Sequence, residues 1–170
     1  MKRIFQAFLL SFAVLVTGIN PVFGANTPQI NITKYKKSDL YGLWYISSNE
    51  KDASGVIFIY VNKDGTAIDA MFGENAGEAI KVKQRSSWTY DEEENIFKQD
   101  IKEISIQVGN ENPEISHPNE IITSSIEIIK LGDEIMGIKF IANDGKVSGY
   151  YKATDEMYKS LLDMAQLHTK

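Results

Sequence analysis

Acidic residues outnumber basic ones by 23 to 18 in the 170-residue chain, which carries a formal net charge of −5. This balance argues against nucleic acid or an anionic membrane surface as the partner. Cysteine is absent, which excludes thiol catalysis, thiolate metal sites, disulfides and lipid attachment to an N-terminal cysteine.

The first 25 residues have the composition of a secretory signal peptide. Met1-Lys2-Arg3 is positively charged, residues 4–19 are mostly apolar, and small residues suitable for cleavage follow at 22–25. The apolar run of about 15 residues is shorter than the roughly 20 that a retained membrane-spanning helix needs. We therefore predict a signal peptide over 1–25 and an exported protein, periplasmic or secreted, with no stable membrane insertion of the mature chain.

Residues 26–38 are polar and predict a flexible lead-in, so the folded domain is expected to cover 39–170. Short β-rich runs divided by turn residues fill most of this domain. The eight runs are 40–48, 56–61, 66–72, 80–90, 97–108, 121–131, 135–141 and 146–152.

Two of these runs show on which side their residues lie. Residues 80–90 alternate strictly, with Ile80 and Val82 on one face and charged residues on the other. In 97–108 the inward set begins with Phe97, Gln99 and Ile101 and then continues from Ile104. This change of parity predicts a β-bulge near Lys102-Glu103.

Turn signals between the runs indicate consecutive antiparallel pairing. Asp64-Gly65 and Asp144-Gly145 suit tight hairpins, and the acidic stretch 91–95 is interpreted as a solvated hairpin tip rather than a calcium loop. Eight strands in this order predict an all-β fold, an antiparallel up-and-down barrel. A helix capped by Thr154 or Asp155 should then pack outside it, through a stripe of Met157, Tyr158, Leu161, Leu162, Met164 or Ala165, and His168.

Gly42-Leu43-Trp44 resembles the Gly-x-Trp signature of the lipocalin-like (calycin) β-barrels, and Trp88-Thr89-Tyr90 is similar to a motif of their bacterial secreted or periplasmic members. The order of eight strands and a C-terminal helix matches this family over almost the whole mature chain. The resemblance implies that Gly42 and Trp44 close one barrel end, with Lys152 over the indole where Arg is usual. The family's Thr-Asp-Tyr signature before the seventh strand is missing. Avidin-like barrels are the second resemblance, but they lack the terminal helix.

No catalytic motif stands out. The only histidines are His117, in a loop, and His168, near the C-terminus. Neither position suits a Ser-His-Asp triad, and a site of three histidine ligands is impossible. No glycine-rich phosphate loop occurs. We therefore expect no catalytic residues, no metal and no cofactor.

The predicted interior is mostly aliphatic with a few polar residues, as ligand pockets are. We therefore predict that the barrel holds a small apolar molecule with one or two polar groups. The candidate ligand-binding residues are Gln84, Ser86, Trp88, Tyr90, Ser124, Met136 and Phe140. The alternative is a barrel filled by its own side chains, such as an inhibitor or accessory factor that binds an envelope protein through the loops 73–77 and 109–119.

Overall fold

The structure is a computed structural model that describes residues 35–50, 53–75 and 77–165. The predicted signal peptide and most of the predicted lead-in lie outside these residues. A short 3-10 helix, η1 (Lys37–Leu40), precedes nine strands and a helix. The elements are β1 (Gly42–Glu50), β2 (Ala53–Val61), β3 (Thr66–Asn75), β4 (Glu78–Asp91), β5 (Ile96–Val108), β6 (Glu114–Ser116), β7 (Glu120–Leu131), β8 (Glu134–Ala142), β9 (Val147–Lys152) and α2 (Asp155–Ala165).

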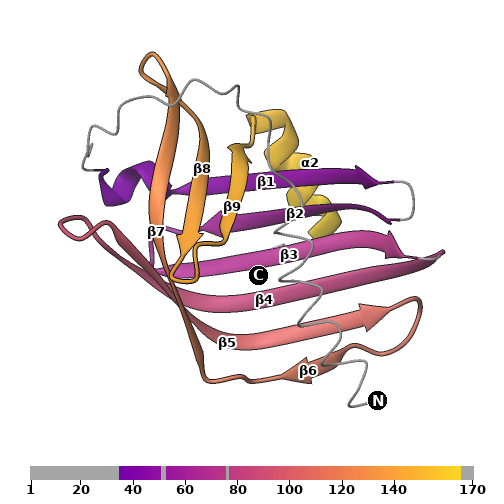
Figure 1. The fold of residues 1–170 in the computed structure, drawn as a ribbon. Coiled ribbons are helices and arrows are strands. Elements are labelled where there is room, and N and C mark those ends of the chain that lie inside the picture. Colours follow the sequence, from indigo (N-terminus) through magenta and orange to yellow (C-terminus); the bar gives the residue numbers. More distant parts are fainter. Residues whose placement is uncertain (1–34, 51–52, 76, 166–170) are drawn as a thin grey trace.

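Eight of these strands form a closed antiparallel barrel (Figure 1). Each strand pairs with the next along the chain, except that β5 pairs with β7. The ring closes where β9 pairs with β1, with Trp44 opposite Lys152 and Tyr45 opposite Tyr151. The three-residue β6 pairs with the second half of β5 and is not part of the ring. The predicted eight-stranded barrel is confirmed.

The predicted alternation and bulge of the central strands are also confirmed. Along β4, alternate residues from Ile80 to Trp88 are buried, and the residues between them are mostly exposed. Arg85 lies opposite Glu103, but Ser86 lies opposite Ile101, which leaves Lys102 as the extra residue of β5. This bulge keeps both halves of β5 facing the interior with their apolar side chains.

A second bulge overturns one predicted inward position. In the β7–β8 pair, Ile129 lies opposite Gly137 and Lys130 opposite Ile135, so Met136 has no partner. Met136 is 40% exposed, and Ile135 packs against the interior core in its place. The prediction that Met136 faces the interior is wrong because the bulge reverses the alternation at that residue. Ile122, near the start of β7, is 39% exposed.

Two hydrophobic clusters lie on opposite sides of the barrel wall. The larger one lies in the interior and includes Trp44, Trp88, Phe97 and Ile138. The smaller one lies on the outer face of β1, β2 and β3, where Met157 and Tyr158 of α2 pack against Leu43, Phe58 and Ala70. The helix therefore packs outside the ring, as predicted. The later residues of its predicted apolar stripe lie outside the part of the chain whose side chains the structure describes.

Candidate functional site

One end of the barrel is closed around Trp44, which is fully buried. Its Nε1 donates a hydrogen bond to the carbonyl of Leu40 at 2.9 Å. The Nζ of Lys152 lies 4.1 Å from the centroid of the indole ring and donates to the carbonyl of Tyr41 at 2.6 Å. Gly42 has φ +117°, and a Cβ there would lie 3.0 Å from Lys152 Nζ. The structure thus brings Gly42, Trp44 and Lys152 together in a packed end of the barrel, where Trp44 and Lys152 also donate hydrogen bonds to backbone carbonyls.

Aromatic side chains continue from this end into the interior. Trp88 is buried, stacks on Phe97 at a centroid distance of 5.6 Å and donates from Nε1 to the carbonyl of Asn62 at 3.0 Å. Phe97 in turn contacts Phe140 at 5.2 Å, and Phe140 contacts Tyr150 at 5.8 Å. Of the predicted ligand-binding residues, Trp88 and Phe140 therefore lie in one continuous aromatic row that could contact an apolar ligand.

The hydroxyl of Tyr90 is hydrogen-bonded within the hairpin turn that follows β4. It donates to the side-chain oxygen of Asn95 at 2.9 Å, and Asn95 Nδ2 donates to the carbonyl of Ile126 at 2.8 Å. Burial, followed by the charge of Glu92 and then of Tyr35, Asp39 and Asp91, raises the pKa of Tyr90 to about 12. Because its hydroxyl is engaged in this turn, Tyr90 stands apart from the polar residues described next.

A polar cluster spans three adjacent strands inside the barrel. Asp69 of β3 lies directly opposite Gln84 of β4, and its Oδ2 accepts hydrogen bonds from Gln84 Nε2 at 2.6 Å and from Gln99 Nε2 of β5 at 2.5 Å. Gln99 Nε2 also lies 2.9 Å from the hydroxyl oxygen of Ser86, which donates to the carbonyl of Ala67 at 3.4 Å. All four polar side chains belong to residues that are at most 8% exposed.

The other carboxylate oxygen of Asp69, Oδ1, is buried and has no hydrogen-bond partner. Asp69 is 6% exposed, and no other acidic or basic residue among the described residues is buried to that extent. Burial raises the pKa of Asp69 from 3.8 to about 7, although the two glutamine hydrogen bonds act in the opposite direction. Burial and then the Asp69 carboxylate raise the pKa of Tyr150 on β9. The interior thus contains one buried acid, Asp69, whose pKa lies near neutral pH and whose Oδ1 has no hydrogen-bond partner.

Sequence reasoning found part of this cluster. Gln84 and Ser86 were predicted as ligand-binding residues and lie in it, whereas Ser124 is buried on β7. Gln99 was predicted to face inward but was not selected as a site residue. Asp69 was not predicted at all. A single carboxylate between Ile68 and Ala70 in a β-rich run is unusual, but it does not indicate on which face of the strand the side chain lies.

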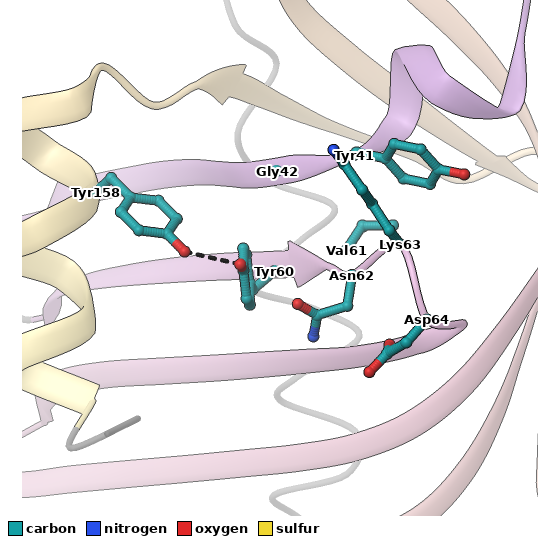
Figure 2. A pocket seen from close by; sticks show the side chains of 8 residues that line it. All are labelled: Tyr41, Gly42, Tyr60, Val61, Asn62, Lys63, Asp64 and Tyr158. Atoms are coloured by element: carbon teal, nitrogen blue, oxygen red, sulfur yellow. Dashed lines mark hydrogen bonds between the residues drawn. The ribbon is translucent and has the colours of Figure 1, made fainter. Parts of the chain in front are cut away.

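A hollow of about 510 Å³ lies on the outside of the barrel, next to α2 (Figure 2). Tyr158 reaches from the helix to Tyr60 of β2, and their hydroxyl groups are hydrogen-bonded at 2.7 Å. Asn62 and Asp64 also line this hollow, and both bond the side chain of Thr66, at 3.1 and 2.6 Å. Because these polar groups stabilise the β2–β3 turn and the helix contact, the interior cluster is the stronger candidate site. The lining residues are Tyr41, Gly42, Tyr60, Val61, Asn62, Lys63, Asp64 and Tyr158.

Within residues 35–50, 53–75 and 77–165, no group of three or more His, Asp or Glu side chains could hold a metal ion. In the same part of the chain, no helix has the length and apolar character needed to cross a membrane.

No protein-family model, curated protein or solved structure matches the chain. The closed barrel of eight antiparallel strands with an external helix is compatible with a lipocalin-like fold.

Proposed function

We propose that the chain is an exported, lipocalin-like binding protein that holds a small, mainly apolar molecule inside its barrel. Asp69, supported by Gln84 and Gln99, is the polar anchor of this site. The aromatic row through Phe97 and Phe140 supplies apolar contact area. The signal peptide predicted for the first 25 residues and the Gly42-Trp44-Lys152 arrangement support the assignment to a secreted or periplasmic lipocalin-like (calycin) group.

The observation that carries this proposal is the unpartnered Oδ1 of Asp69. Burying a carboxylate in an apolar interior costs free energy unless its oxygens are hydrogen-bonded. An apolar residue at this position would make a more stable barrel, so the carboxylate is best explained by a role in binding. A ligand that donates a hydrogen bond to Oδ1 would complete the cluster. An eight-stranded barrel has an interior that is either filled by its own side chains or holds one small ligand, and the proposal takes the second case.

The first experiment asks whether the exported protein carries a small molecule. The full-length chain is expressed, and the exported form is purified and analysed by native mass spectrometry, with solvent extraction to identify any bound compound. We expect one bound small molecule per protein, and much lower occupancy in Asp69→Asn. Asp133→Asn is the matched control, because it removes the same charge from an exposed turn.

The alternative function, a protein-binding barrel without a ligand, is supported by a different observation. Ile115 lies in β6, within the segment 109–119, and is 59% exposed. Ile121 lies at the start of β7, just after this segment, and is 65% exposed. Exposed apolar residues at a loop are typical of protein contacts. A purified protein free of small molecules, together with a stoichiometric envelope partner that is lost in Ile121→Asp, would favour this alternative and contradict the proposed function.

A further inference from the structure

We infer that the interior site selects molecules with a protonated amine on a small apolar body, and that the ammonium group binds at Oδ1 of Asp69. This inference rests on the proposed function, because it names the class of ligand that the barrel would hold.

The hydrogen bonds leave a single acceptor for the ligand. A carboxylate accepts with both oxygens, and both available amide donors, from Gln84 and Gln99, lie on Oδ2 of Asp69. Oδ1 has no donor. A ligand group that completes the cluster while Asp69 is ionised must therefore donate a hydrogen bond to Oδ1.

The charges around Asp69 favour a cationic donor over a neutral one. The neighbour opposite Asp69 on β2 is Ile59, and those from β4 and β5 are the neutral amides of Gln84 and Gln99. The titratable group that faces it from β9 is Tyr150, which supplies no positive charge. No Lys, Arg or His is buried with Asp69 among the described residues. A hydroxyl group would satisfy only the hydrogen bond, whereas an ammonium group would also neutralise the buried charge.

The proton on Asp69 then controls binding. An ammonium group can bind only to the ionised carboxylate, whose pKa in the free protein is about 7. The affinity for an amine should therefore fall as the pH falls, by about 30-fold between pH 8 and pH 5.5, in proportion to the ionised fraction. A neutral alcohol has no such requirement for charge, and an anionic ligand would show the opposite dependence.

The test uses three probes of equal chain length: octylamine, octan-1-ol and octanoate. Binding to the exported protein is measured by isothermal titration calorimetry at pH 5.5, 6.5, 7.5 and 8. We expect octylamine to bind at least tenfold more tightly than octan-1-ol at pH 8 and to lose about 30-fold in affinity by pH 5.5. Asp69→Asn should remove both the preference and the pH dependence, and Asp133→Asn should retain both. The pH series on the unmodified protein decides the matter even if Asp69→Asn does not fold.

The outcomes separate this inference from the proposed function. Equal binding of octylamine and octan-1-ol, tightest binding of octanoate, or an amine affinity that is constant between pH 5.5 and 8 would overturn the inference and leave the proposed function in place. If none of the probes binds, the inference is wrong, and the native mass spectrum of the exported protein then decides separately whether the barrel carries a ligand.

Discussion

The replacement Asp69→Asn should change how the stability of the protein depends on pH. Asp69 has a pKa of about 7 in the folded state, against 3.8 for an ordinary aspartate. Between these values the folded protein holds a proton that the unfolded chain has released. The contribution of Asp69 to the free energy of unfolding should therefore be greatest below pH 4, decrease as the pH rises from about 4 to 7, and stay constant above 7.

The size of the effect follows from the two pKa values. A difference of about three pKa units, at about 1.4 kcal/mol each, corresponds to a loss of about 4 kcal/mol across this window. Asparagine has nearly the same shape, and its side-chain oxygen can still accept from Gln84 and Gln99, but it does not ionise. Asp69→Asn should therefore be more stable than the unmodified protein by up to about 4 kcal/mol at pH 8 and about equally stable at pH 4.

Urea denaturation of the ligand-free protein, followed by tryptophan fluorescence at pH 4, 5, 6, 7 and 8, measures this difference. Trp44 and Trp88 are both buried in the barrel and report its unfolding. The control is Asp133→Asn, whose stability should follow that of the unmodified protein. If Asp69→Asn and the unmodified protein instead gave parallel curves over the whole range, Asp69 would have an ordinary pKa, and the description of a dry, uncompensated carboxylate would be refuted.

Three further replacements test the closed end and the external helix by urea denaturation. Trp44→Ala should lower the free energy of unfolding by about 3–5 kcal/mol because it removes a buried indole; unchanged stability with lost binding would show that Trp44 contacts the ligand instead. Gly42→Ala should destabilise by about 1–3 kcal/mol, because φ is +117° and the new Cβ would lie 3.0 Å from Lys152 Nζ; a neutral result would refute this tight contact. Tyr158→Phe should cost about 1 kcal/mol by removing the hydrogen bond to Tyr60, and no loss would mean that the bond does not hold α2.

The positions of the residues in β4 and β5 could be predicted because each of these strands has one buried face and one face turned toward solvent. In β4 the charged residues Lys81, Lys83 and Arg85 lie on the outer face between the buried positions, so the alternation is visible in the sequence. The bulge at Lys102 was visible for the same reason, since the apolar positions of β5 change parity there. Met136 was misplaced because residues 135–141 are almost all apolar, and a bulge in such a run leaves no mark in the pattern.

The sequence by itself therefore determined the class of fold, since turn residues and alternation specify consecutive antiparallel strands. Only the tertiary structure decided which side Asp69 faces. In the middle of β3 the residues of both faces are buried or half-buried, because the interior core lies on one side and the cluster around Ala70, against which α2 packs, lies on the other. A strand buried on both faces has no alternation, so neither the inward position of Asp69 nor its contact with Gln99, 30 residues away, could be predicted. Pairing of β3 and β5 with the two edges of β4 brings Asp69, Gln84 and Gln99 together, and with them the candidate site.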